Sequence, residues 1–241
     1  MAGPETSLED RVLGAPHARH GFEDCVERLG TAIRLGVYPD GSTLPPEREL
    51  ALRLGVSRAT LREAIAALRS ARLVRTVRGR AGGTVVDHRP ATPHDDPDAV
   101  AGRRVELLDS LAFRRIVEPG ACATAAARDL SAAQRQLVSD ALERVAGAVD
   151  PAEHRQADSR LHLAIATVTE SDLIVDAVTT VQRYLHDMLV AIPVLPVNIE
   201  HSSAQHAAIV AAVLAGDADT ARDVMEQHCD DTAALLRGLL Q

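Results

Sequence analysis

Aromatic residues are scarce in this 241-residue chain, which contains no tryptophan, two tyrosines and two phenylalanines. Leucine, valine, isoleucine and alanine must therefore fill its core, and this composition favours packed helices. No apolar run reaches the ~20 residues that a membrane-spanning helix needs, and residues 1–20 are too polar for a signal peptide. These absences predict a cytoplasmic protein that does not enter a membrane.

Cysteine and positive charge are also limited. Cys25, Cys122 and Cys229 are widely separated and form no CxxC motif, which excludes a disulfide framework and indicates a reducing compartment. The chain has no lysine, and its formal net charge is −8. Because the chain as a whole is acidic, any contact with nucleic acid has to be confined to one part of it.

Residues 44–70 have the pattern of two short helices joined by a tight turn. Gly55 stands where a left-handed residue closes the first helix, and Ser57 is a strong N-cap for the second. Arg58, Thr60 and Arg62 fall in or near the first turn of the second helix, away from its apolar face. A helix that presents arginines in this way, braced by another helix, is typical of a helix-turn-helix.

Two β-branched runs follow, at residues 73–77 and 83–86, with Gly79, Arg80 and Gly82 at the turn between them. They predict the wing of a winged helix-turn-helix, with Arg80 at its tip. Residues 41–90 contain ten arginines and four acidic residues, whereas residues 91–241 contain twelve arginines and twenty-three acidic residues. A basic module on an acidic chain indicates DNA binding by that module alone.

The motifs in this stretch resemble the DNA-binding domain of the GntR family of bacterial transcription regulators. They are Pro46-Glu47-Arg48-Glu49-Leu50-Ala51, Leu54-Gly55-Val56-Ser57-Arg58, Leu61-Arg62-Glu63-Ala64, Leu68 and Leu73-Val74. An amphipathic hairpin with merely solvated arginines explains neither the turn nor the wing. We expect Arg58 or Arg62 to read guanine through a bidentate contact. The further DNA contacts are assigned to Arg48, Thr60, Arg80 and Gly82.

Beyond residue 102, apolar residues recur at intervals of three and four, which predicts an antiparallel bundle of six or seven helices. Pro119-Gly120 is expected to interrupt the first helix, with a new helix from Ala121. The predicted fold class is therefore mainly α, with an N-terminal winged helix-turn-helix before an all-α bundle. The expected parts are a mobile arm (1–20), the DNA-binding domain (21–88), a linker (89–101) and the bundle (102–241).

Asp158 and His162 lie four residues apart on one predicted helix, so they share a face. With His206 and His228 from the last two helices, they offer a possible divalent metal site. The spacing alone is weak evidence, because an Asp–His pair at this distance is usually a hydrogen bond. His154 lies one turn before Asp158 and shares its face, and we interpret it as a residue behind the metal ligands or at the surface; His186 and His201 are interpreted as bystanders outside the metal shell.

The bundle resembles the FCD ligand-binding domain of FadR-like GntR regulators, in which an Asp and a His four residues apart and two later His bind a metal. The matching pieces are Asp158-Ser159-Arg160-Leu161-His162, Ser202-Ser203-Ala204-Gln205-His206-x-x-Ile209 and Met225-Glu226-Gln227-His228; the usual acid before the second His is Gln205 here. The resemblance implies a divalent metal on Asp158, His162, His206 and His228, with zinc preferred over nickel or manganese.

Arg114 lies in a stretch, Arg114-Arg115-Ile116-Val117-Glu118-Pro119, that resembles the start of the same domain, where an Arg faces the ligand cavity. A guanidinium beside a metal suits a carboxylate, so a small organic acid is the expected effector. The alternative is a surface ion pair of Arg114 with Glu118.

These observations predict a metabolite-responsive transcription regulator, with repression favoured over activation, that binds a pseudo-palindromic operator as a homodimer. The first alternative is a metal-dependent enzyme domain fused to a DNA-binding module, in which three His and one Asp activate water. The second is a bundle that only dimerises and binds neither metal nor ligand.

Overall fold

The computed structural model describes residues 21–79, 82–89, 104–189 and 196–239. Its contacts divide the chain into two compact units. The first unit contains residues 21–30 and Thr43–Asp87, and the second contains Thr31–Ser42 and the described residues from His88 onward. The expected mobile arm, the wing residue Arg80 and all but the first residue of the expected linker lie outside the described residues.

The first unit consists of short helices and a two-stranded sheet. Its described elements are α2 (Gly21–Arg34, of which the last four residues belong to the second unit), α3 (Glu47–Leu54), α4 (Arg58–Ser70), β1 (Val74–Val77) and β2 (Gly83–Val86). The strands pair antiparallel, with Val74 opposite Val86 and Val77 opposite Gly83, and Thr43 adds a bridge to Val85. This is the winged helix-turn-helix that the sequence predicts.

The turn between α3 and α4 follows from two residues. Gly55 adopts a left-handed backbone (φ 68°) and donates its N–H to the last turn of α3, so it ends that helix. Ser57 accepts a hydrogen bond from the Thr60 N–H at 3.0 Å and thereby begins α4. The inner face of α4 is fully buried, and it holds the helix in place through Leu61, Ala64, Ile65 and Leu68.

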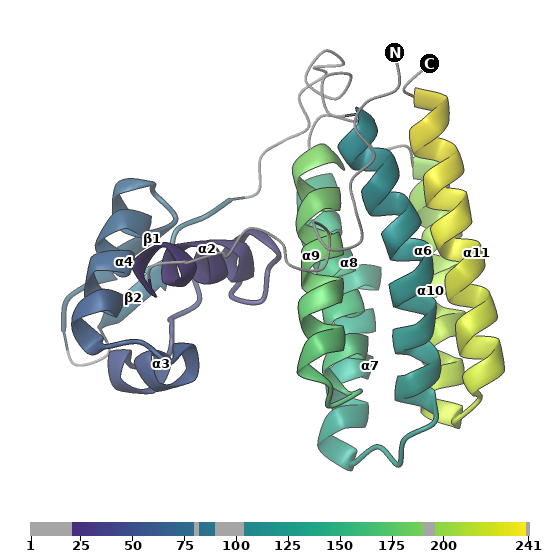
Figure 1. The fold of residues 1–241 in the computed structure, drawn as a ribbon, viewed down its shortest axis with the longest axis horizontal. Coiled ribbons are helices and arrows are strands. Elements are labelled where there is room, and N and C mark those ends of the chain that lie inside the picture. The colour runs from purple at the N-terminus through teal and green to yellow at the C-terminus, as the bar shows by residue number, and fades with distance from the viewer. Residues whose placement is uncertain (1–20, 80–81, 90–103, 190–195, 240–241) are drawn as a thin grey trace, which may run out of the picture. The chain divides into compact units, whose positions relative to one another are not determined.

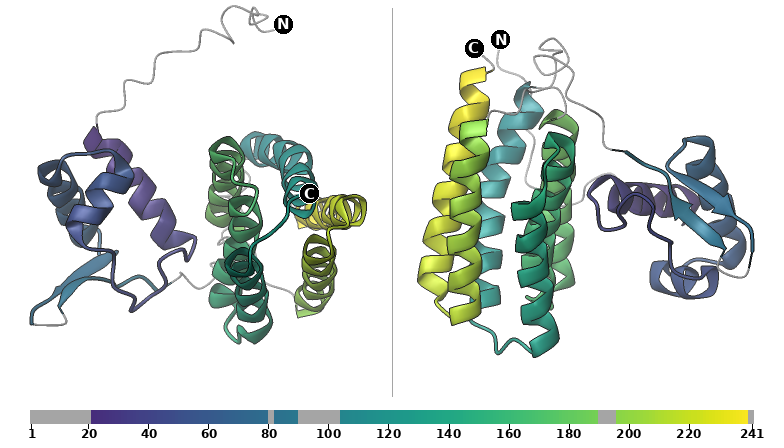
Figure 2. Two further views of the ribbon diagram at one scale, coloured as in Figure 1. Left: turned by 90° about the horizontal axis from the view of Figure 1, so that it is seen from below. Right: turned by 180° about the vertical axis from the view of Figure 1, so that it is seen from behind.

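The second unit is a bundle of six helices over its described residues. They are α6 (Arg104–Ala126), α7 (Ala132–Gly147), α8 (Pro151–Thr167), α9 (Asp172–Leu189), α10 (Pro196–Ala215) and α11 (Ala218–Leu239). Figures 1 and 2 show these helices side by side, with α6 between α9 and α11. The prediction of a mainly helical fold is confirmed, and none of the described helices is long and apolar enough to cross a membrane.

The expectation that Pro119-Gly120 interrupts the first helix is wrong, because α6 runs through Pro119 without a break. A proline inside a helix removes one backbone hydrogen bond and disfavours the helix locally. Here the residues on both sides of it are buried against α8, α9 and α11, including Leu111, Ala121 and Cys122. Tertiary packing therefore overrides the local preference.

The interior of the bundle is aliphatic, as the shortage of aromatic residues requires. Its largest cluster joins α6, α7, α8, α10 and α11 and includes Leu161, Ile209 and Met225. Cys25, Cys122 and Cys229 are buried free thiols. Leu35, from the segment Thr31–Ser42, packs with Leu163 and other residues of the bundle, which is why this segment belongs to the second unit.

Candidate DNA interface and candidate metal centre

The first turn of α4 presents its arginines to solvent. The side chains of Arg58 and Arg62 are each 59% exposed. Thr60 is half-buried, and its hydroxyl lies 2.8 Å from that of Ser57, so the N-cap also fixes this side chain. Because the buried face of the same helix anchors it, the exposed arginines stand on a rigid element. Arg48, on α3, is exposed as well.

Glu47 is a member of this surface that the sequence analysis missed. Its carboxylate accepts a hydrogen bond from Nε of Arg62 at 2.8 Å and lies 4.0 Å from Nη2 of Arg58. Fifteen residues separate Glu47 from Arg62, so no helical spacing reveals the pair; only the packing of α3 on α4 creates it. Glu47 therefore holds the two predicted base-reading side chains together while DNA is absent.

The turn of the wing tolerates no side chain at Gly82. A Cβ atom at this position would lie 2.3 Å from the carbonyl oxygen of Val77 and 2.9 Å from that of Gly79. The Gly82 N–H donates to the Gly79 carbonyl, and Gly79 itself has a φ of 122°. In the structure, Gly82 thus closes a narrow turn.

Three histidines from three helices meet inside the bundle. His162 on α8, His206 on α10 and His228 on α11 are each at most 3% exposed, and their ligand-type nitrogens lie within 4.8 Å of one another. Asp158, one turn before His162, borders the group: its carboxylate lies 3.3 Å from Nε2 of His206 and 4.0 Å from Nε2 of His162. The structure thus brings all four predicted ligands together.

The donor set fits a divalent metal. Among the described residues, Nε2 of His162, His206 and His228 has no hydrogen-bond partner although it is buried. Unpaired buried nitrogens cost free energy, so several of them within one buried cluster indicate a missing partner. Three imidazoles and one carboxylate match the ligands that zinc and similar ions prefer.

Polar side chains lie beside Nδ1 of His228 and of His162, whereas Nδ1 of His206 has no hydrogen-bond partner among the described residues. Nδ1 of His228 lies 3.1 Å from Oε1 of Gln205, whose amide nitrogen donates to Asp231 at 2.7 Å. Nδ1 of His162 lies 3.0 Å from Oε2 of Glu118. Such contacts fix the ring tautomer and leave Nε2 as the electron-pair donor. Gln205, the departure from the family pattern, therefore orients His228.

Burial favours the neutral form of His206 and His228. It lowers the pKa of His206 to about 4, although the nearby Asp158 carboxylate opposes the shift. Burial likewise lowers the pKa of His228 well below its ordinary value, and the positive charge of Arg114 adds to the effect. Neutral imidazole is the form that binds a metal, so near pH 7 the rings of His206 and His228 need lose no proton to do so.

Arg114 is buried rather than exposed. It is 2% exposed, and its Nε donates to Oε2 of Glu118 at 2.8 Å. The ion pair of the alternative interpretation is therefore present, but it lies inside the bundle and not at the surface. Glu118 also accepts from Gln182 at 2.6 Å. Burial alone would raise the pKa of Glu118, but the charges of Arg114 and His162 hold it well below the ordinary value. Arg114 thus reaches the histidines through Glu118.

The three histidines that the sequence analysis does not assign as metal ligands, His154, His186 and His201, differ in their burial. His201 is exposed and lies 2.9 Å from Asp231, in agreement with the interpretation that it is outside the metal shell. His154 and His186 are each 8% exposed, so neither is a surface residue. Nε2 of His154 has no hydrogen-bond partner among the described residues. The sequence spacing gave no signal for this burial, because α8 is buried over most of its circumference.

Two family models match the chain. Bacterial regulatory proteins of the gntR family match residues 23–86, and the FCD domain matches residues 109–231. The first range covers the helix-turn-helix and its wing, and the second covers Arg114 and all four predicted metal ligands. The match to the FCD domain extends over half of the chain.

Several proteins that are named as regulators are similar over nearly the whole length. The chain is 33% identical to a protein of Mycobacterium gastri named as the HTH-type transcriptional regulator RmpR, covering 95% of this chain and 84% of that one. It is 30% identical to the Uxu operon transcriptional regulator of Escherichia coli (91% and 88%) and 31% identical to a regulatory protein of the L-lactate dehydrogenase operon of the same species (86% and 82%). These relatives are regulators and not enzymes.

Solved structures share the fold. Escherichia coli McbR/YncC superimposes with a TM-score of 0.54 at 18% identity, covering 92% of this chain and 99% of that one. A GntR transcriptional regulator from Rhodococcus sp. RHA1 superimposes with a TM-score of 0.51 at 22% identity, covering 90% and 97%. The order of a winged helix-turn-helix and a helical bundle is therefore found in known structures.

Proposed function

The chain belongs to the gntR family of bacterial regulatory proteins and is a DNA-binding transcriptional regulator with an FCD domain, and we propose that it is a metal-containing repressor released from its operator by a small carboxylate. The observation that carries this proposal is the group of three buried histidines whose ligand-type nitrogens lie within 4.8 Å of one another and whose Nε2 atoms have no hydrogen-bond partner among the described residues. The exposed arginines of α4 supply the contact with DNA, and the polar interior of the bundle supplies the effector site.

On the DNA side, α4 lies in the major groove and Arg58 or Arg62 reads guanine. Glu47 moves off these arginines when phosphates and base edges take its place. Arg48 and Thr60 contact the backbone or a base edge, and the wing with Arg80 and Gly82 contacts the neighbouring groove. In support, Arg58 and Arg62 are exposed on a helix whose opposite face is fully buried.

In the bundle, Asp158, His162, His206 and His228 would hold a divalent ion, with zinc as the first choice. When bound, the ion acts as a Lewis acid that attracts a carboxylate oxygen. Glu118 and Gln205 keep the rings of His162 and His228 oriented toward it. Arg114 offers guanidinium N–H groups beyond the Nε that Glu118 occupies, and these bind the effector. One relative is named for the L-lactate dehydrogenase operon, and lactate is a small carboxylate.

Dimerisation is proposed to use the outer face of α6. Val105 and Ile116 are 83% and 74% exposed there, and Leu108 and Phe113 are partly exposed. Val105, Leu108 and Ile116 recur at helical spacing and form one apolar stripe. Two copies joined in this way would carry two recognition helices to a pseudo-palindrome. An Ile116→Glu variant is expected to sediment as a monomer, whereas an unchanged dimer would exclude this face.

The metal is tested by elemental analysis of the purified full chain. We expect one divalent ion per chain in the wild type and in a His88→Gln control, and less than a tenth of that in His162→Ala combined with His206→Ala. Because these two rings are buried, Asp158→Asn provides a milder second variant in which affinity for zinc falls 10- to 100-fold. Stoichiometric metal in the double variant would contradict the assignment of the ligands.

The regulator is tested on a DNA site selected from a random library with the wild-type protein. Arg58→Ala is expected to weaken binding to that site by ~1–3 kcal/mol and to relax base preference at one position in each half-site. An equal loss on random DNA would assign Arg58 to a phosphate instead. In a transcription assay with the site placed over a promoter, the protein should lower transcription, and a small carboxylate should restore it; an increase in transcription would contradict the repressor.

A further inference from the structure

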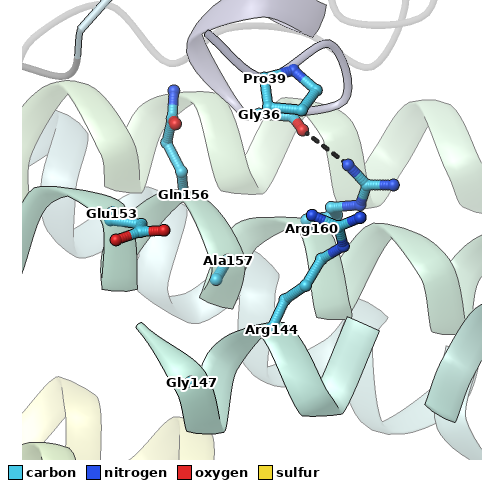
Figure 3. A pocket seen from close by; sticks show the side chains of 8 residues that line it. All are labelled: Gly36, Pro39, Arg144, Gly147, Glu153, Gln156, Ala157 and Arg160. Atoms are coloured by element: carbon cyan, nitrogen blue, oxygen red, sulfur yellow. Dashed lines mark hydrogen bonds between the residues drawn. The ribbon is translucent and has the colours of Figure 1, made fainter. Parts of the chain in front are cut away.

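A second cavity lies in the bundle unit, outside the histidine cluster. It has a volume of about 280 Å³, is bordered by α7, α8 and the segment Thr31–Ser42, and opens to solvent. Figure 3 shows the side chains that line it, with α7 and α8 below and Gly36 and Pro39 above. Its lining contains none of the predicted metal ligands and not Arg114, so it is a separate site.

Two arginines dominate the cavity. Arg144 comes from α7 and Arg160 from α8, and Figure 3 shows both guanidinium groups on the same side of the cavity. Nη1 of Arg160 donates to the carbonyl oxygen of Gly36 at 3.2 Å. Arg144 has no hydrogen bond or ion pair with any described residue. Burial lowers the pKa of Arg160, and the charge of Arg144 lowers it further. Arg144 is exposed and Arg160 is half-buried, so water screens part of the repulsion between these like charges, and a bound anion would offset the rest.

The described acidic groups nearby form no ion pair with these arginines, although the charge of Asp140 partly offsets that of Arg144 by raising the pKa of Arg160. Glu153 lines the same cavity, but Figure 3 shows its carboxylate on the side of Gln156, away from the guanidinium pair. Asp140, one helical turn before Arg144, accepts a hydrogen bond from Gln136 at 2.5 Å and forms no ion pair with either arginine. The pair therefore keeps guanidinium N–H groups available for a ligand in the cavity.

The segment above the cavity is held closely against α8. Gln156 donates its amide N–H groups to the carbonyl oxygens of Arg34 at 2.9 Å and Ile33 at 3.4 Å. Gly36 has a φ of 70°, and a Cβ atom there would lie 3.1 Å from the Cβ atom of Gln156. Only glycine fits this close approach without strain. The segment continues along the chain into α3, which begins at Glu47.

We propose that this cavity binds a small oxyanion, a phosphate or carboxylate group, between the guanidinium groups of Arg144 and Arg160, and that its occupancy stabilises the conformation of the segment Thr31–Ser42. Guanidinium forks match the geometry of both oxyanions and bind them through charge-assisted hydrogen bonds. A volume of about 280 Å³ lies at the lower end of ligand sites, so the occupant is an inorganic ion or a short metabolite rather than a nucleotide.

The experiment uses the full chain and isothermal titration with inorganic phosphate, at an ionic strength held constant with sodium chloride. Wild type should bind phosphate with a 1:1 stoichiometry. Arg144→Gln should weaken binding at least tenfold, and it keeps the fold because Arg144 has no described bond to lose. Arg160→Gln should weaken it as much. Arg222→Gln, an exposed arginine of α11, is the matched control and should bind like the wild type.

Further arms separate the sources of the ligand and the two sites. Succinate in place of phosphate, titrated into His162→Ala so that the proposed metal site does not contribute, distinguishes a carboxylate site from a phosphate site, and tighter binding of one assigns the cavity to it. His162→Ala should bind phosphate like the wild type, because it removes a proposed metal ligand and leaves the arginines untouched. Binding lost in His162→Ala but kept in Arg144→Gln would place the anion at the histidine cluster and overturn the proposal. Absence of binding at 10 mM phosphate, or equal weakening in Arg222→Gln, would overturn it too.

The second half of the proposal is tested by amide hydrogen exchange. Phosphate should slow exchange over residues 31–42 in the wild type and leave it unchanged in Arg144→Gln. If phosphate binds but exchange in this segment stays the same, the site exists and its link to the segment is refuted. A wild-type-like slowing in Arg144→Gln would show that the effect comes from another site.

Discussion

Removal of the Glu118 carboxylate should destabilise the bundle strongly. Arg114 and Glu118 are 2% and 1% exposed, and the pair is joined at 2.8 Å. A Glu118→Gln variant keeps the shape and can still accept from Gln182, but it leaves the guanidinium charge buried without a partner. Breaking one side of such a pair costs about 3–5 kcal/mol, which is a large part of the roughly 5–15 kcal/mol that stabilises a typical domain.

A double-mutant cycle measures this coupling. Glu118→Gln and Arg114→Met should each lower the free energy of unfolding of the bundle by about 3–5 kcal/mol, whereas the double variant should lose less than the sum because no unpaired charge remains. Urea denaturation followed by circular dichroism provides the values. Arg115→Met is the control: the adjacent arginine binds Glu226 and Asp230 at the surface, so its loss should barely move the midpoint. If each single variant lost less than ~1 kcal/mol of unfolding free energy and the double variant lost their sum, the argument that the pair is buried and coupled would be refuted.

Three further predictions concern the two units. Glu47→Gln should raise affinity for operator and random DNA alike severalfold in fluorescence anisotropy, because it frees Arg62 and removes a charge that repels phosphate; unchanged affinity would mean that the pair does not compete with DNA. Gly82→Ala should weaken operator binding because its Cβ would lie 2.3 Å from a carbonyl oxygen, whereas Gly238→Ala, which meets no atom within 4 Å, should not. With a chelator present, His206 should stabilise the bundle above pH 6.5 by about 3 kcal/mol relative to pH 4. The reason is that the unfolded ring, with a pKa of about 6.5, binds a proton more tightly than the folded ring, with a pKa of about 4. This contribution is therefore lost as pH falls from 6.5 toward 4. Denaturation midpoints that do not change between pH 7 and pH 4 would contradict this.

The helix-turn-helix could be predicted from sequence because its signals are local. Gly55 and Ser57 determine the end of α3 and the beginning of α4 through contacts within three or four residues. The wing strands were predicted for the same reason, since Gly79 and Gly82 permit the turn that pairs them. Family resemblance added the assignment of DNA contacts, which local chemistry alone does not provide.

The continuity of α6 could not be predicted, because it depends on distant residues. Locally, Pro119 and Gly120 disfavour a helix. Burial of the same stretch against α8, α9 and α11 keeps the helix continuous. The sequence pattern does not indicate which elements pack together, so it could not predict this burial. The pairing of Glu47 with Arg62 and the burial of His154 were missed for the same reason, because both arise from packing between elements.

Local spacing and family resemblance each made a prediction about Arg114, and the two roles that they predict can be separated by experiment. Spacing predicted a pair with Glu118, and resemblance predicted an arginine facing the cavity; the structure shows the pair inside the bundle, next to the histidines. Only Nε of Arg114 is engaged by Glu118, so a carboxylate effector can join the guanidinium without displacing Glu118.

An Arg114→Lys variant tests this division. Lysine keeps the positive charge beside Glu118 but cannot form the planar fork that holds a second carboxylate. The variant should therefore lose less unfolding free energy than Arg114→Met, yet it should no longer release operator DNA when a carboxylate is added. If Arg114→Lys releases DNA like the wild type, Arg114 stabilises the fold only and the effector is bound by other groups.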